Sequence, residues 1–276
     1  ISYRALETAV RLNGAAVDAN LAALALGRAL IGAPERVEAL LAPRPSVDPA
    51  AQSFVERLDF LAADLEAYQD RRLADDFRMR VERLRAAEAK ALPGSEGLTR
   101  AAMEMLYRVT AIKDEYEVAR HQSDPAFTAR LAETFEGAHE IRFVMAPPLL
   151  SPLDPATGRP KKSSWGPWIL PAMRVLAGLK RLRGSWADPF GRTAERRAER
   201  AMRDAYRGDL ERVAADLDRD GAAARLDLLL DLTSWPREAK GYGPVKEAGM
   251  ARARATRDAV LAKLDAPEEI TARAAE

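Results

Sequence analysis

The stretch that decides the fold class is residues 54–91, FVERLDFLAADLEAYQDRRLADDFRMRVERLRAAEAKA. Apolar side chains recur in it at steps of three and four, the spacing of one face of an amphipathic α-helix. These side chains are Phe54, Leu58, Leu61, Leu65 and Tyr68, followed by Leu73, Phe77, Val81 and Leu84. Leu92-Pro93-Gly94 ends the pattern, because proline and glycine interrupt helices. The stretch therefore predicts long helices that pack through one apolar face.

A second apolar stripe predicts one helix from residue 102 to residue 119. It consists of Ala102, Met105, Val109, Ile112, Tyr116 and Ala119. The two stripes could bury against each other in an internal core or serve contacts with another chain. Asp124-Pro125 ends the second helix and starts a short one that reaches about Glu133. Residues 141–145, IRFVM, are the one convincing strand.

Helical patterns also occupy both ends of the chain. Residues 3–31 are helical with a break at Asn13-Gly14, and residues 42–49, APRPSVDP, read as a linker. Asp188-Pro189 predicts an N-cap followed by proline at the first helical position. The apolar face of that helix is expected at Ala194, Ala198, Ala201, Ala205, Leu210, Val213 and Leu217, beside a Glu199–Arg203 ion pair. Further helices are expected at 226–232 and 245–264.

The expected fold is therefore mainly α. It is a multi-helix domain with one small strand element and an irregular Gly/Pro/Trp-rich middle segment at residues 136–192. We expect a helical segment at 1–41, a linker at 42–53 and a C-terminal helical domain at 54–276. The chain begins at Ile1 inside a helical pattern, which suggests a segment of a longer polypeptide.

Composition excludes several classes of site. The 43 Lys and Arg residues balance 42 Asp and Glu residues, which argues against a nucleic-acid or membrane-surface protein. Cysteine is absent, so disulfides, iron–sulfur ligation and Cys nucleophiles within this chain are excluded. Two histidines, His121 and His139, make a His-based zinc site improbable. Neither a membrane-spanning run nor a signal-peptide pattern is visible, so we expect a cytoplasmic protein.

The sequence contains no motif of a cofactor site or of a catalytic triad. GxGxxG, GxxxxGK[ST], GxSxG and HExxH do not occur. We therefore predict no catalytic, cofactor-binding or metal-binding residue in this chain.

Two charged features remain as candidates. Residues 113–117, KDEYE, could supply acid–base or cation-binding carboxylates, although a solvated helix face is favoured. A basic belt, which we define as residues 159–183, contains seven Lys and Arg residues and no acid. It could hold a phosphate, a nucleotide or an acidic protein surface, or it could dock on acidic helices of the same chain.

Two turns are further candidates. Trp165-Gly166-Pro167-Trp168, together with Asp188-Pro189-Phe190-Gly191, could line a pocket, although such aromatics more often fill a core. Residues 241–246, GYGPVK, could offer backbone N–H groups and Lys246 to an anion, although a structural turn is favoured.

A set of short segments carries a family resemblance. They are LNGAAVDANLAALALGR (12–28), KDEYEVAR (113–120), FEG (135–137), APPLL (146–150), DPATGRPKK (154–162), GPW (166–168), LRG (182–184), DPFGRTAERR (188–197) and GYGPVK (241–246). In this order they resemble the C-terminal region of the fused bacterial indolepyruvate ferredoxin oxidoreductases. Residues 1–41 resemble the end of the part related to the gamma subunit. The family commonly has His where this chain has Pro244.

The resemblance implies a parent enzyme that decarboxylates aryl pyruvates oxidatively. That enzyme uses coenzyme A, thiamine diphosphate with Mg, and an iron–sulfur cluster, and passes electrons to ferredoxin. The family's cofactor-binding residues lie outside the part present here. The resemblance therefore implies a non-catalytic segment whose partners are the catalytic portion, ferredoxin and, in the parent enzyme, a second copy. The alternative is a helical scaffold or a module that docks an electron carrier or coenzyme A.

The expected binding site combines the cations, turns and aromatics of the basic belt. We predict that an anion or a partner binds at Arg159, Lys161, Lys162, Trp165 and Trp168, with Lys246 converging from the second turn.

Overall fold

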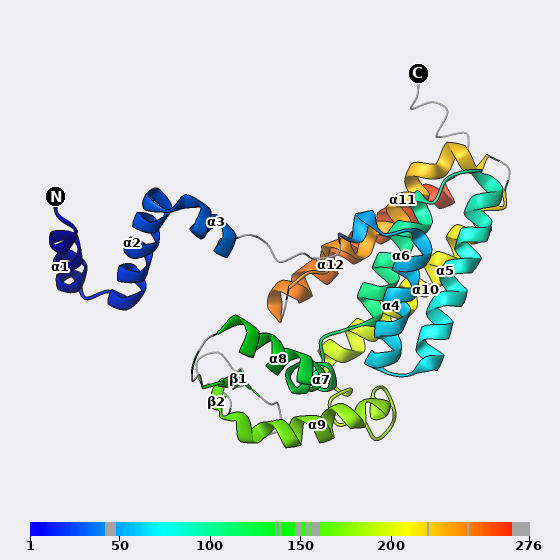
Figure 1. Ribbon diagram of the computed structural model, residues 1–276. Coiled ribbons are helices and arrows are strands. Elements are labelled where there is room, and N and C mark those ends of the chain that lie inside the picture. The colour runs from blue at the N-terminus through cyan, green and yellow to red at the C-terminus, as the bar shows by residue number, and fades with distance from the viewer. Residues whose placement is uncertain are drawn as a thin grey trace. The chain divides into compact units, whose positions relative to one another are not determined.

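The computed structural model describes residues 1–41, 48–135, 137, 140–146, 151–152, 155, 161–219, 221–241 and 243–266. Over these residues the chain forms twelve α-helices and one two-stranded sheet (Figure 1). The predicted mainly α fold is confirmed. The chain divides into two compact units, residues 1–52 and residues 53–276. The predicted division into a gamma-like end, a linker and a C-terminal domain stays a prediction.

The first unit consists of three helices and a 3-10 turn. They are α1 (Tyr3–Asn13), α2 (Val17–Gly32), α3 (Pro34–Leu41) and η1 (Pro49–Ala51). Ser2 caps α1 by accepting a hydrogen bond from the Ala5 N–H. Gly14 ends α1 with φ 69°, a left-handed conformation that glycine adopts without strain. The predicted break at Asn13-Gly14 is confirmed.

The second unit contains a bundle, which we define as six helices around one core (Figure 1). Its elements are α4 (Phe54–Tyr68), α5 (Arg71–Ala91), α6 (Gly97–Thr110), α10 (Ala194–Leu217), α11 (Leu226–Ser234) and α12 (Pro244–Asp265). The turns η4 (Ala222–Arg225) and η5 (Trp235–Glu238) flank α11. The predicted stripe from Phe54 to Tyr68 is buried, Val109 is buried, and Ile112 packs against the same core. The first stripe and the part of the second from Ala102 to Ile112 therefore pack in an internal core of this chain.

Carboxylates and hydroxyls at helix starts set the element boundaries in the bundle. Ser53 and Glu56 form a capping box at α4. Asp70 accepts from the Leu73 N–H, which separates α5 from α4 although the apolar stripe continues across both. Glu88 of α5 is buried and accepts hydrogen bonds from the Leu98 and Thr99 N–H groups at the start of α6. Glu88 thereby ties two consecutive helices together.

The remaining elements of the second unit form a subassembly between α6 and α10. They are α7 (Glu115–Ser123), α8 (Pro125–Thr134), β1 (Phe143–Met145), β2 (Ser163–Trp165), η2 (Pro167–Ile169), α9 (Leu170–Gly178) and η3 (Leu179–Leu182). β1 pairs antiparallel with β2, with Phe143 opposite Trp165. The strand predicted at 141–145 is confirmed as β1. Its partner β2 is too short and too polar to show in the sequence.

Three sequence-based expectations about helices are wrong. The helix predicted over 102–119 ends at Thr110, because Asp114 accepts from the Glu117 N–H and starts α7. Asp188 does not cap a helix; α10 begins at Ala194, and Thr193 caps it.

The third, the buried face of α10, is wrong only in the first half of the helix. Leu210, Val213 and Leu217 are buried as expected, but earlier the buried face passes through Met202 and Tyr206, whereas Ala201 is exposed. The expected Glu199–Arg203 pair does not form, because Arg203 pairs with Asp204.

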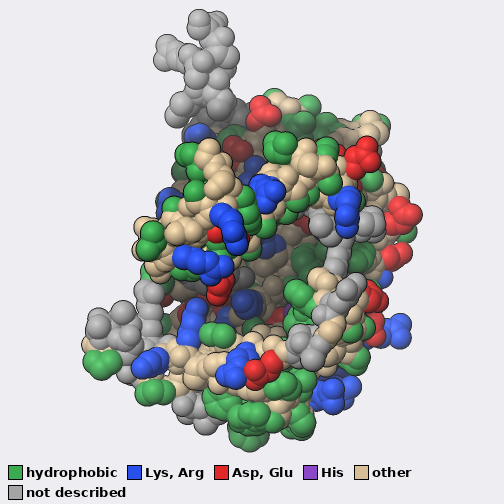
Figure 2. Space-filling model, turned by 60° about the vertical axis from the view of Figure 1, so that its left-hand side comes forward, with side chains coloured by type: hydrophobic (Ala, Val, Ile, Leu, Met, Phe, Trp, Pro, Cys, Tyr) green, Lys and Arg blue, Asp and Glu red, His purple; other side chains and the backbone are tan. Residues whose placement is uncertain are grey.

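The outer side of α9 exposes apolar side chains. Figure 2 shows hydrophobic side chains gathered at the lower edge of the molecule, the height at which Figure 1 draws α9. Trp168, Val175 and Leu179 are spaced at helical intervals and are exposed, with Trp168 at 68% and Val175 at 67%. Nearby in sequence, Trp186 is 87% exposed. α9 thus turns an apolar face outward as well as packing on α7.

Candidate functional site

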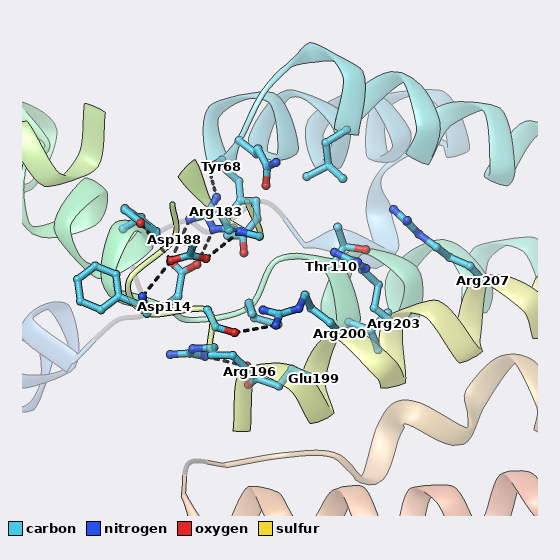
Figure 3. Close-up of a pocket in the computed structure, with 18 residues that line it drawn as sticks. Tyr68, Thr110, Asp114, Arg183, Asp188, Arg196, Glu199, Arg200, Arg203 and Arg207 are labelled. Atoms are coloured by element: carbon cyan, nitrogen blue, oxygen red, sulfur yellow. Dashed lines mark hydrogen bonds and ion pairs between the residues drawn. The ribbon is translucent and has the colours of Figure 1, made fainter. Parts of the chain in front are cut away.

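A cavity of about 250 Å³ lies where the bundle meets the subassembly (Figure 3). Its wall is formed by the end of α4, the end of α6, the start of α7, the turn after η3 and one face of α10. Five arginines and three carboxylates contribute to the lining: Arg183, Arg196, Arg200, Arg203, Arg207, Asp114, Asp188 and Glu199. The lining is therefore polar and carries more cations than anions.

A buried ion pair forms one end of this cavity. The side chains of Asp114 and Arg183 are only 5% and 10% exposed, and Arg183 Nη2 donates to Asp114 Oδ1 at 2.9 Å. Arg183 Nη1 also donates to the Tyr68 carbonyl at 2.6 Å, and the guanidinium stacks 3.6 Å from the centre of the Tyr68 ring. Arg183 therefore joins the subassembly to the end of α4 in the bundle.

Asp188 organises the turn beside this pair. It accepts hydrogen bonds from the Gly184 N–H at 2.7 Å, the Phe190 N–H at 3.0 Å and the Tyr116 hydroxyl at 3.2 Å. Burial alone would raise the pKa of Asp188, but these hydrogen bonds outweigh it and hold the pKa below its usual value. Burial, with the nearby Asp188, raises the pKa of Tyr116 to about 12. Asp188 is thus an ionised acceptor that fixes the backbone.

A second cavity of about 220 Å³ lies on the other side of Glu199. The Glu199 carboxylate is 2% exposed, and it accepts from Arg196 Nη1 at 2.8 Å and from the Lys246 ammonium. The lining of this second cavity also includes Arg108, Lys113 and Lys240. Glu199 therefore separates two cavities with predominantly basic walls.

The residues predicted for the binding site fall into separate places. Arg159 lies outside the described residues. Lys161 and Lys162 are exposed. Trp165 and Trp168 lie together, with ring centroids 5.5 Å apart. Lys246 lines the second cavity, whose lining residues include neither Trp165 nor Trp168.

The structure therefore pairs the two tryptophans and does not bring Lys246 to them in that cavity. Binding at these positions stays a prediction.

The structure contradicts the solvated-face interpretation of residues 113–117 at Asp114 and supports docking on the same chain for part of the basic belt. Asp114 does not belong to a solvated face, because it is buried against Arg183. The basic belt is divided in two. Lys180 donates to the Ala67 carbonyl and Arg183 pairs with Asp114, so these two cations dock on the same chain. Lys161, Lys162, Arg174 and Arg181 are exposed.

Sequence reasoning missed the arginines that face the first cavity from α10. Arg200, Arg203 and Arg207 follow one another at steps of three and four, which places them on one helix face. That spacing was visible in the sequence. The residues opposite them come from α6, almost a hundred positions earlier, and no local pattern connects the two segments.

A family model, described as a family of unknown function (DUF6537), matches residues 55–259. The chain belongs to this family. The match covers the bundle and the subassembly together. No curated protein and no solved structure matches the chain.

Two kinds of site are absent from the described residues. In that part of the chain no helix is both long enough and apolar enough to cross a lipid bilayer. The same residues hold no group of three or more His, Asp or Glu side chains arranged to bind a metal ion.

Proposed function

We propose that this DUF6537 chain is the accessory C-terminal segment of an indolepyruvate ferredoxin oxidoreductase of the fused bacterial type. The proposal rests on the ordered set of short segments from KDEYEVAR at 113–120 to GYGPVK at 241–246. Several of these segments meet at one place: Asp114, Arg183, Asp188 and Arg196 all line the first cavity. The resemblance thus concentrates on the contact between the bundle and the subassembly.

A structural role for these side chains supports a non-catalytic segment. Asp114 pairs with Arg183, Glu199 pairs with Arg196 and Lys246, and Asp188 accepts two backbone N–H groups. A general base must offer a free acceptor to a substrate proton. The oxygen atoms of these three carboxylates instead accept hydrogen bonds from groups of the protein itself.

The experiment compares the intact parent oxidoreductase with a version that lacks this segment. We expect the 276-residue chain alone to give no product from indolepyruvate, coenzyme A, thiamine diphosphate and an electron acceptor. We expect the truncated parent to lose turnover or subunit assembly, and to regain it when the chain is added back. Turnover by the isolated chain, or a truncated parent with full activity and an intact assembly, would contradict the proposal.

The exposed face of α9 favours a docking role within that assembly. Exposed cations at Lys161, Lys162, Arg174 and Arg181 lie in the same segment as the apolar side chains of Trp168, Val175, Leu179 and Trp186. An apolar centre with basic neighbours fits a protein partner whose own surface is acidic, and ferredoxin is the candidate that the family resemblance supplies.

Charge reversal tests this docking role. In the intact parent, Lys161→Glu with Lys162→Glu should slow electron transfer to ferredoxin at low salt and matter less at high salt, because screening shortens the range of the field to roughly 10 Å at 0.1 M. Lys263→Glu, an exposed lysine on α12, is the matched control and should leave the rate unchanged. Equal kinetics in the double variant and the control at every salt concentration would refute the docking role.

A further inference from the structure

Three arginines of α10 point into the first cavity from one side. All three line the cavity: Arg203 and Arg207 lie on the side of Thr110 at the end of α6, whereas Arg200 turns toward the Gly191 carbonyl (Figure 3). Guanidinium groups repel one another at short range unless anions lie between them. These three charges therefore require compensating anions.

Carboxylates of the chain balance them incompletely. Arg207 Nη2 pairs with Asp76 at 2.9 Å, but Asp76 also accepts from Arg80 Nε at 3.0 Å. Arg203 pairs with Asp204, the neighbouring residue, whose side chain is 59% exposed.

Arg200 has still less charge compensation from carboxylates. It donates to the Gly191 carbonyl at 2.6 Å, and none of the described carboxylates forms an ion pair with it. Positive charge is thus left over at this end of the cavity.

The imbalance is also visible in the pKa of Arg207. Burial, and after it repulsion from Arg203, lowers the pKa of Arg207 despite the attraction of Asp76. Several paired arginines of the described chain show the opposite direction; the pKa of Arg257, for instance, is raised by its hydrogen bonds to Asp209. Arg207 is therefore held in an environment that an additional anion would stabilise.

Two residues that line the cavity each carry a buried polar atom with no hydrogen-bond partner within the described chain. One such atom is Arg207 Nε, and the other is Thr110 Oγ1, on a side chain that is 95% buried because its exposure is 5%. Both groups can donate a hydrogen bond. A buried donor without an acceptor costs on the order of 1–3 kcal/mol, so such groups usually have a partner. Both residues therefore retain a donor that an acceptor bound between α6 and α10 could engage after a small side-chain rotation.

The remaining wall of the cavity is partly apolar. Leu73, Val109 and Ile112 contribute to it beside the arginines. An acceptor with several oxygen atoms and two negative charges suits converging guanidinium forks, and apolar walls suit a carbon skeleton attached to it.

We propose that this cavity binds the phosphate group of a small molecule, held by Arg200, Arg203 and Arg207 of α10 and by the Thr110 hydroxyl of α6. The proposal does not depend on the function proposed above, because it concerns binding by this chain alone. Binding would fill the space between two bundle helices and should therefore stabilise the fold.

The test is calorimetric titration of the full 276-residue chain with inorganic phosphate and with phenyl phosphate at low ionic strength. We expect saturable one-to-one binding and a rise in Tm with ligand concentration. Equal affinity for both probes supports the free ion as the ligand, and tighter binding of phenyl phosphate supports a phosphate monoester. Benzoate, a carboxylate of similar size, should bind at least tenfold more weakly.

Variants assign the binding to this cavity. Arg203→Gln and Arg207→Gln should each weaken phosphate binding about tenfold or more, the expected loss of a charged hydrogen bond in a partly buried site. Thr110→Val keeps the shape of the side chain and should weaken it severalfold. Arg72→Gln, an exposed arginine of α5 outside the cavity, removes the same charge and should have no such effect.

Three results would overturn the proposal. The first is no heat and no Tm shift with either phosphate at concentrations up to about 10 mM, beyond the range of weak specific binding. The second is equal weakening by Arg72→Gln and Arg203→Gln, which would indicate a general charge effect. The third is benzoate binding as tight as that of phenyl phosphate.

Discussion

The ion pair between Asp114 and Arg183 should be the strongest single link between the subassembly and the bundle. Both side chains are almost fully buried, and Arg183 also contacts the Tyr68 carbonyl and ring of α4. Removing one partner of such a pair leaves the other charge buried and unpaired, which costs about 3–5 kcal/mol. We therefore expect Asp114→Asn and Arg183→Met each to lower the free energy of unfolding by about 3 kcal/mol.

The double variant distinguishes this ion pair from independent contributions. The second substitution removes a charge that the first has already left unpaired. The double variant should therefore lose about 2 kcal/mol less free energy of unfolding than the sum of the two single losses. Urea unfolding followed by far-UV circular dichroism measures all four proteins. Hydrogen exchange should show that the amides of α7 and α9 lose protection first.

An exposed pair on the bundle is the matched control. The side chains of Arg71 and Asp75 on α5 are 82% and 63% exposed and lie 3.6 Å apart. Their double-variant cycle should give a coupling of only about 0.2–0.5 kcal/mol. If the Asp114–Arg183 cycle is additive to within about 0.5 kcal/mol, as the control should be, then the pair does not act as a unit and the reasoning fails.

Three further outcomes are expected. Glu88→Gln should lower the free energy of unfolding by about 2–3 kcal/mol, because it removes the charge that accepts four hydrogen bonds at the start of α6, while the exposed Glu82→Gln should have little effect. Burial would raise the pKa of Glu88, but these hydrogen bonds hold it below its usual value. Its stabilisation is therefore present above about pH 4.3 and is lost as the pH falls through the folded-state pKa, so urea midpoints measured from pH 6 downward should decline more steeply in the wild type than in Glu88→Gln. Acrylamide should quench the fluorescence of the exposed Trp168 and Trp186 but not that of the buried Trp235. Replacing both exposed tryptophans by Phe should therefore shift the emission maximum to shorter wavelength and reduce quenching. Unchanged quenching would show that this surface is covered.

Helix type and position could be predicted from the sequence far better than helix ends. The apolar stripe from Phe54 to Tyr68 gave α4 because periodicity reports burial directly. The stripe resumes in α5 after a single step of five from Tyr68 to Leu73, and the capping by Asp70 marks the boundary there. Likewise the pattern from 102 to 119 crosses the end of α6, because Tyr116 is buried in a different contact.

The candidate site depended on long-range contacts that no local pattern carries. Asp188 before Pro189 looks like a helix start, yet its acceptors serve Gly184, Phe190 and Tyr116. Thr110 and Arg207 line one cavity although nearly a hundred residues separate them. The basic belt was visible in the sequence, but its division into exposed and internally paired cations depends on where Asp114 lies in space.

The order of the bundle helices along the chain has a consequence for biosynthesis. α4, α5 and α6 are consecutive and pack on one another through short turns, so they can associate soon after they leave the ribosome. Their shared apolar surface is completed by α10, α11 and α12. The first of these to be made, α10, places its Tyr206 hydroxyl 3.4 Å from the Ala102 carbonyl of α6, and this hydroxyl donates to the Thr233 carbonyl at 2.7 Å.

About eighty residues must be synthesised between the end of α6 and the start of α10. At elongation rates of about 5–20 residues per second, the nascent three-helix intermediate exposes its core for several seconds. We therefore expect this chain to depend on chaperones that shield apolar surface during translation, more than its final content of buried side chains would suggest.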